Sequence, residues 1–351
     1  MERRILIVFL ILSFSMISVF AQTLDETLEG LSGDAAESYV GPIVSSFGAN
    51  LNGGWFHKSP KAKFLGLDFE LGLVAMGTFF NDEDDYFSTT GSFRFNYDQA
   101  YQMTEGIDPA IRDYMIDAIM QQDFEVIIQG PTIVGPSDQY LEIVFPGQDI
   151  EYEGVGGVID SEFVGDKSIT TEISGLLDGA AALPFVAPQL SIGTLFGTML
   201  TARIVPAFDV PDLGEVSYYG FGLQHNIKAW MPVPLPVDVS LAAYIQTLKL
   251  GDYVTANGFT SGLTVSKTFG PKTFSFTPYA GYMMESSNME FSYEYIVDED
   301  IDPVNIEFDV DGKNKSRITL GASFRLGISN LNVDYNMGEY NSVTMGLAIA
   351  F

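Results

Sequence analysis

The feature that most constrains this fold is an alternation of large apolar and small side chains at the end of the chain. Between residues 342 and 351 every second residue is large and apolar, and the residues between them are small. This period of two matches a β-strand, whose successive side chains point to opposite faces of a sheet. One whole face of the segment is therefore suited to an apolar medium. Its members are Val343, Met345, Leu347, Ile349 and Phe351.

The same alternation recurs along most of the chain. It is found in residues 67–75, 219–231, 237–246, 258–269, 273–282, 318–327 and 331–338, and a less regular strand is expected near residues 190–205. After residue 21 there is no run of about eighteen apolar residues, which a membrane-spanning helix needs. Lipid offers no partner for backbone amides, so a chain without such helices crosses a bilayer only as a closed barrel. The alternative is a soluble sandwich of meandering strands.

The lengths of the connections favour the barrel. Transmembrane barrels have short periplasmic turns and longer external loops. If the last strand ends in the periplasm, the short turns at 232–236, 270–272 and 327–330 are periplasmic. Residues 207–217, 249–256, 285–316 and 338–342 are then external, and most of these are longer and acidic. We therefore predict an all-β fold, a transmembrane antiparallel β-barrel of about twelve to fourteen strands, with fourteen preferred for a chain of this length.

The N-terminus predicts export. Residues 1–21 combine Arg3 and Arg4, an apolar stretch and the small-residue pattern Val19-Phe20-Ala21, as in a secretory signal peptide cleaved before Gln22. Residues 22–60 precede the first firm strand and are partly helical at 27–47, so we expect a periplasmic or lumen-plugging segment, followed by the barrel at 61–351. A helix is also expected at 108–122, where Asp108 precedes Pro109. Together these features predict the outer membrane of a Gram-negative-type bacterium.

The charge of the chain excludes nucleic acid as a partner and suits cations. The formal net charge is −29, yet 46% of the residues are hydrophobic. Both properties are accommodated if apolar residues face lipid and acids occupy aqueous loops. Two acidic runs are candidate sites for Ca²⁺, or for the divalent ions that bridge lipopolysaccharide. Neither has EF-hand spacing, and a solvated acidic loop is the alternative. Their residues are Asp82, Asp84, Asp298, Asp300 and Asp302.

Polar side chains on the other face of the predicted strands indicate a hydrated or plugged lumen. Mixed charges and amides of this kind fit a pore for small solutes, although a structural barrel could share them. We predict as lumen-facing Asp68, Glu70, Gln224, Asn226, Lys228, Asp238, Gln246, Arg325 and Asp334.

Nothing in the sequence predicts an enzyme or a cofactor other than Ca²⁺. The two histidines are His57, ahead of the first firm strand, and His225, on the apolar face of its strand. Neither position supplies a general base in a wet, shaped site. The sequence also contains no nucleophile elbow, phosphate-binding loop or His-plus-carboxylate metal spacing.

Several short motifs resemble a bacterial outer-membrane family, domain of unknown function 6588. They include Leu51-Asn52-Gly53-Gly54-Trp55-Phe56, Gly130-Pro131-Thr132 and Tyr219-Gly220-Phe221-Gly222 through His225 to Trp230-Met231-Pro232. The resemblance implies a barrel and brings no activity or catalytic residue. In general plan the chain is also similar to the fatty-acid and aromatic-hydrocarbon transporters of the outer membrane, which have fourteen strands and an N-terminal plug.

Two functions follow as expectations. The first is a passive, porin-like channel or transporter for small molecules, hydrophobic ones among them. The second is a structural or surface-binding barrel whose acidic external loops bind divalent cations, lipopolysaccharide or another partner. The terminal strand ending at Phe351 resembles the signal recognised by the barrel assembly machinery, which is therefore an expected partner along with outer-membrane lipid.

Overall fold

The structure, a computed structural model, describes residues 33–154, 156–164, 166–210, 214–231, 235–271, 273–295 and 304–351. These residues form two compact units. The barrel unit contains residues 40–82 and 179–351, and the inserted unit contains residues 34–39 and 83–178. The predicted signal peptide at 1–21, and Asp298, Asp300 and Asp302, lie outside the described residues.

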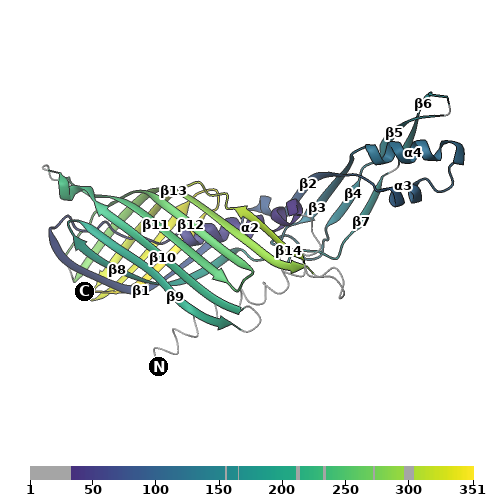
Figure 1. The fold of residues 1–351 in the computed structure, drawn as a ribbon. Helices are drawn as coiled ribbons and strands as arrows, with labels where there is room; N and C mark the ends of the chain where they lie inside the picture. Colours follow the sequence, from purple (N-terminus) through teal and green to yellow (C-terminus); the bar gives the residue numbers. More distant parts are fainter. Residues whose placement is uncertain are drawn as a thin grey trace. The chain divides into compact units, whose positions relative to one another are not determined.

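The barrel unit is a closed antiparallel sheet of ten strands (Figure 1). Each strand pairs with two neighbours, and the β12–β13 and β1–β17 pairings complete the ring. A further strand, β14 (Val304–Asp311), pairs with the far half of β13. The ten strands are β1 (Leu65–Phe79), β8 (Ala182–Leu195), β9 (Thr198–Val210), β10 (Gly214–Asn226), β11 (Asp238–Leu250), β12 (Val254–Ser266), β13 (Phe274–Tyr295), β15 (Ser316–Leu326), β16 (Ser329–Met337) and β17 (Ser342–Ala350).

The expected number of strands was therefore too high. About twelve to fourteen strands were expected, but in the described chain the strands of residues 83–178 pair only among themselves, outside the ring. The irregular alternation of this region has a physical reason. Its apolar residues meet a small internal core rather than lipid, so a strict period of two is not required.

The two ends of the barrel differ in their connections. At the short-turn end, β8 and β9 are joined by residues 196–197, and β15 and β16 by residues 327–328. At the long-loop end, residues 80–181 join β1 to β8, and residues 296–315 join β13 to β15. The backbone N–H of Phe351 donates to the Phe69 carbonyl (2.9 Å), so the chain ends at the short-turn end.

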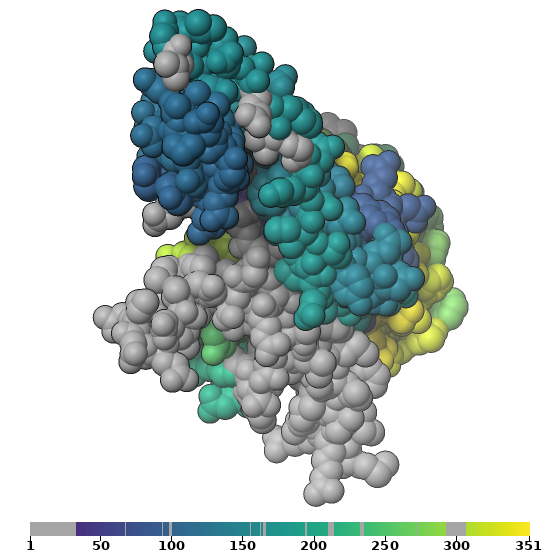
Figure 2. Space-filling model, turned by 90° about the vertical axis from the view of Figure 1, so that its right-hand side faces the viewer, coloured from purple at the N-terminus to yellow at the C-terminus, as the bar shows by residue number. Residues whose placement is uncertain are grey.

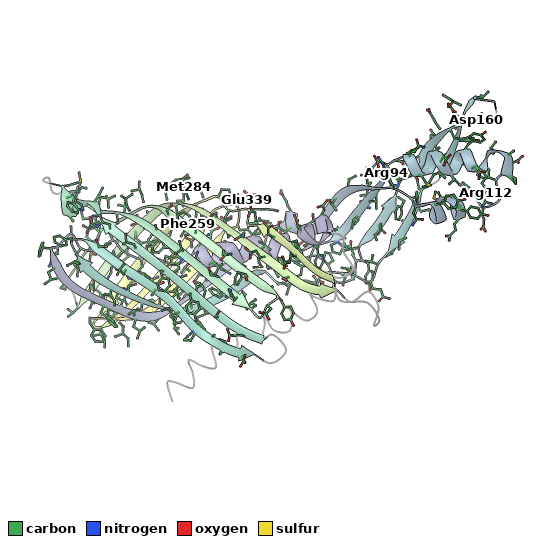
Figure 3. The ribbon with its side chains drawn as sticks, in the orientation of Figure 1. Arg94, Arg112, Asp160, Phe259, Met284 and Glu339 are labelled. Atoms are coloured by element: carbon green, nitrogen blue, oxygen red, sulfur yellow. The ribbon has the colours of Figure 1, made fainter. Side chains whose placement is uncertain are left out.

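The barrel has its large apolar side chains outside. Leu71, Leu241 and Leu347 are each more than half exposed, and Figure 3 marks two further members on the barrel wall, Phe259 and Met284. The inner face carries small and polar residues that are buried, including Thr264 and Asn332. This inversion of the usual soluble pattern identifies a barrel built for an apolar surrounding. The soluble sandwich is excluded by the same observation, because the large side chains do not meet in a core.

Among the described helices, none combines the length and apolar character needed to cross a bilayer. The longest, α2 (Gly33–Asn52), contributes residues 34–39 to the inserted unit and residues 40–52 to the barrel unit. It overlaps the helix expected within 27–47, of which residues 27–32 lie outside the described chain.

The inserted unit has two small sheets and two helices. The predicted helix is confirmed as α4 (Pro109–Gln121): the Asp108 side chain accepts from the Ala110 N–H (2.9 Å), and proline occupies the first turn. Ile116 and Ile119 of α4 pack with Ala100, Phe124 and Ile150. In Figure 2 the blue surface of α3 and α4 lies against the teal surface of β5 and β6. The other elements are η1 (Asp82–Asp85), β2 (Tyr86–Phe93), α3 (Tyr97–Met103), β3 (Phe124–Pro131), β4 (Glu142–Phe145), β5 (Gln148–Glu153), β6 (Ile159–Val164) and β7 (Lys167–Thr170).

The end of α2 that belongs to the inserted unit is held there by Tyr39. Its hydroxyl donates to the Ser174 carbonyl (2.8 Å), and its own carbonyl accepts from the Ile133 N–H (3.1 Å). Burial raises the pKa of the Tyr39 phenol. The phenol is therefore neutral at physiological pH and can act as this donor.

Candidate functional site: the occupied lumen

Residues 45–60, here called the lumen segment, run through the barrel from one end to the other. At the long-loop end, the Ser45 hydroxyl accepts from the Lys313 N–H (3.2 Å). Also near the long-loop end, the Thr78 hydroxyl of β1 donates to the Asn50 side chain (2.8 Å). At the short-turn end, the Asn226 side chain donates to the Pro60 carbonyl (2.6 Å). The N-terminal chain therefore enters from the long-loop end and leaves beside the short turns.

Aromatic side chains fill the middle of the lumen. Trp55 is 1% exposed and stacks on Tyr244 of β11, with ring centroids 4.9 Å apart. Phe56 meets Tyr279 of β13 edge to face at 6.0 Å. Gly220 is required beside this cluster, because a Cβ there would lie 2.7 Å from the Trp55 ring. The wall is therefore shaped to receive the lumen segment.

Two arginines from the wall bind the carboxyl end of α2. Arg317 of β15 donates to the Asn52 carbonyl (2.6 Å), and Arg203 of β9 donates to the Gly53 carbonyl (2.9 Å). These carbonyls lack helical partners and carry the negative end of the helix dipole, so cations stabilise them. Arg203 also lies over the Trp55 ring, 4.0 Å from its centroid.

A fully buried ion pair supports this contact. Arg317 Nη1 lies 3.1 Å from Glu285 Oε2, and both side chains are at most 2% exposed. The other Glu285 oxygen accepts from the Asn314 side chain (3.0 Å). Charges removed from water are costly unless they are paired, so this group depends on every member being present.

A second charged group holds the lumen segment as it leaves the barrel. His57 Nε2 lies 2.9 Å from Glu70 Oε2, and Lys58 Nζ lies 3.1 Å from Asp68 Oδ2. Lys58 also contacts the second Glu70 oxygen. Both carboxylates project inward from β1, two residues apart, as the alternation requires.

The sequence matches the family described as "Family of unknown function (DUF6588)" over residues 1–351. The chain belongs to this family. No curated protein matches the sequence. The occupied lumen and the ten-stranded ring are thus features of one member of the family.

Similar solved structures include outer-membrane barrels. Vibrio cholerae OmpT is 9% identical with a TM-score of 0.23, and covers 82% of this chain and 99% of its own. The β domain of the Bordetella autotransporter BrkA is 13% identical with a TM-score of 0.20, covering 82% and 99%. The Pseudomonas putida toluene transporter TodX is 9% identical with a TM-score of 0.17, covering 81% and 88%. Such low values carry no argument, and the fold rests on the strand pairing above.

Most of the polar residues predicted for the lumen contact the lumen segment or neighbouring inner-face groups. Asp68 and Glu70 bind Lys58, Gln246 donates to the Asn52 side chain (2.6 Å), and the Asp238 carbonyl accepts from the Ser59 hydroxyl (3.3 Å). The other five are placed as follows. Asn226 binds Pro60, Gln224 donates to Thr264, Asp334 accepts from Tyr279, Lys228 lies in the turn η2 (Ile227–Trp230) with Nζ 3.7 Å from Asp238, and Arg325 donates to the Ala350 carbonyl.

The structure does not assemble the predicted calcium site within the described residues. Asp82 is exposed and Asp84 is buried, both in η1. No group of three or more His, Cys, Asp or Glu side chains in the described parts of the chain is arranged to hold a metal ion. With Asp298, Asp300 and Asp302 outside those parts, Ca²⁺ binding stays a prediction.

His225 lies on the outer side of β10 at the short-turn end. Its Nδ1 is 2.9 Å from the Thr198 hydroxyl, and the Trp230 indole N–H donates to its Nε2. Both ring nitrogens are therefore engaged in a polar and aromatic surface group.

The passage of the lumen segment through the barrel can be tested by a disulfide. The Ser59 N–H donates to the Ser266 hydroxyl (2.9 Å), and the chain contains no cysteine. We expect the variant S59C/S266C to oxidise within the folded barrel and to migrate differently on a non-reducing gel. The matched control S59C/S217C pairs Ser59 with the long-loop end of β10 and should stay reduced. Equal oxidation of both variants would contradict this path.

Proposed function

We propose that this chain is an outer-membrane barrel that anchors the inserted unit at the cell surface while keeping its own lumen closed. The single observation that carries the proposal is that one part of the chain fills the barrel while another part forms a separate folded unit. The lumen segment occupies the interior of a ten-stranded barrel, and a separately folded unit is inserted between β1 and β8.

The outer surface of the barrel supports a membrane location. Nearly every strand turns large apolar side chains outward, and strands such as β11 and β12 are long enough to cross hydrocarbon. In barrels of this class the short turns face the periplasm and the long loops face outward. The β1–β8 connection belongs to the long-loop end, so the inserted unit is assigned to the exterior.

The inserted unit has the surface chemistry of a binding domain. Tyr97, Tyr101 and Tyr114 of α3 and α4 are each more than 40% exposed. Tyr97 and Tyr101 stack on each other, and the Arg112 guanidinium lies 3.7 Å from the centroid of the Tyr101 ring. Exposed tyrosine and arginine are the residue types that dominate protein-binding surfaces. This favours the surface-binding function over a purely structural one.

Passive passage of small molecules is the competing function, and the lumen contacts weigh against it. A solute would have to displace Trp55, Phe56 and the buried Arg317–Glu285 pair. The toluene transporter among the similar structures lends no support at its TM-score. A channel would therefore require the lumen segment to move first.

Surface labelling tests the assigned orientation. The cysteine-free chain allows single cysteines at two exposed serines: Ser161 in β6 of the inserted unit and Ser329 at the short-turn end. We expect a membrane-impermeant maleimide to label S161C on intact cells, and S329C only after the outer membrane is permeabilised. The reverse pattern, or a lack of maleimide labelling of S161C on intact cells, would contradict the proposal.

A further inference from the structure

A cavity of about 210 Å³ opens beside the lumen segment at the short-turn end of the barrel. Its walls come from four places: residues 58–63, Glu70 of β1, the start of β13 with the turn before it, and the β15–β16 hairpin. All of them belong to the barrel unit. The cavity therefore lies at the mouth assigned to the periplasm.

Cations gather in this cavity although they are scarce in the chain. Lys58, Lys61, Lys63 and Arg325 line it, against the single carboxylate of Glu70. The whole protein has 17 Lys and Arg for 46 Asp and Glu. A local excess of positive charge in so acidic a protein creates a field that attracts anions.

The charges of the cavity are only partly neutralised by the protein. Lys58 is committed to Glu70 and Asp68. Arg325 instead donates to the backbone carbonyls of Gly327 (3.1 Å) and Ala350 (2.8 Å). These partners are neutral, so the positive charge of Arg325 is not compensated. In the described chain no carboxylate lies within ion-pair distance of Lys63, which is exposed. Lys63 is thus available to contact a ligand, and the uncompensated charge of Arg325 adds to the positive field of the cavity.

Neutral donors complete the lining. The hydroxyls of Thr268 and Ser275 and the side-chain N–H groups of Asn330 line the same cavity, whereas the Thr277 hydroxyl donates to Thr268 (3.0 Å) and the Ser323 hydroxyl donates to the Asn330 oxygen (2.7 Å). Hydroxyls and ammonium groups approaching from several sides suit a tetrahedral anion with several acceptor oxygens. A planar carboxylate would be matched better by one forked arginine contact, and Arg325 is already bound to the backbone.

We infer that this cavity binds the phosphate group of an anionic ligand at the periplasmic mouth. The phosphate has two possible sources: a soluble phosphate compound of the periplasm, or the headgroup of an inner-leaflet phospholipid. The inference does not depend on what the inserted unit binds.

The test uses the full mature chain, purified in a non-ionic detergent without phosphate. Its primary variant is K61Q/K63Q, because both side chains are exposed and their loss leaves the buried pairs intact. The matched control is K249Q/K315Q, which removes the same charge from exposed lysines outside the cavity lining. Calorimetric titration with inorganic phosphate examines the soluble source. Native mass spectrometry after reconstitution with phosphatidylglycerol, or with phosphatidylcholine, examines the lipid source.

We expect K61Q/K63Q to weaken phosphate binding, or retention of phosphatidylglycerol, by at least about tenfold, with the control unchanged. Binding of free phosphate identifies a soluble ligand, whereas retention of phosphatidylglycerol alone identifies a lipid headgroup. The inference is overturned if neither probe binds the wild-type chain, or if K61Q/K63Q and K249Q/K315Q bind equally. Unchanged heat-dependent gel mobility of both variants confirms that any loss is not unfolding.

Discussion

Replacement of Glu285 with alanine is expected to destabilise the folded barrel by about 3–5 kcal/mol. Glu285 is fully buried and lies 3.1 Å from Arg317, whose guanidinium also holds the Asn52 carbonyl at the end of α2. Without the carboxylate, the arginine keeps its charge in a dry interior with no counter-ion. Urea unfolding in detergent, followed by tryptophan fluorescence in a W230F background so that Trp55 alone reports, measures the change.

Two further variants define this effect. E285M/R317M removes both charges and keeps the volume apolar, so it should regain much of the lost stability. R94A removes an exposed partner of Asp123 and should cause little measurable change, because solvent already screens that pair. An E285A variant that unfolds at the same urea concentration as R94A would show that the buried pair contributes nothing.

The barrel strands were predictable because lipid imposes a rule on every residue. In β11, Leu241 and Ile245 must face outward and Ala242 and Tyr244 inward, so the period of two is written into the sequence. The inserted unit follows no such rule. Ile116 of a helix and Phe124 of a strand pack in one ordinary core there. The predicted number of barrel strands was too high because the inserted unit does not face lipid.

The sequence predicted which residues line the lumen, but it did not predict which residues they contact. Alternation identified Asp68 and Glu70 as inward-facing, but nothing local indicates that they meet Lys58. Arg203 and the Gly53 carbonyl are 150 residues apart. Glu285 was predicted to lie in an external loop, because the clear alternation ends before it. This was wrong, since β13 continues to Tyr295. Extending the same inward phase along β13 would have revealed it.

The size of the barrel explains why the lumen segment is needed. An eight-stranded barrel is just filled by its own side chains, and the interior widens as strands are added. Ten strands leave additional space, and Gly220 and Gly281 enlarge it where Trp55 and Phe56 lie. The walls and the lumen segment therefore form one packed interior. Removing the segment should leave a continuous hydrated passage lined by polar groups.

This passage gives the last prediction, a change from a silent to a conducting barrel. A chain in which the export signal is joined directly to residue 61 lacks the lumen segment, and we expect it to conduct ions in planar lipid bilayers. The wild-type chain should not conduct, because the segment contacts the wall from Lys313 to Asn226. The deletion also removes contacts that stabilise the barrel, so a milder variant is useful. W55A/F56A removes only the central aromatic side chains and should show brief openings.

The control replaces residues 86–175 with a short glycine–serine linker, which removes most of the inserted unit and leaves the lumen segment in place. It should stay silent, because closure depends on the lumen contacts alone. Oxidised S59C/S266C should stay silent as well, since its segment is tied to β12. Conductance of the wild-type chain equal to that of the truncated chain would reverse the conclusion. It would show that residues 45–60 do not close the lumen, and passive transport would become the better function.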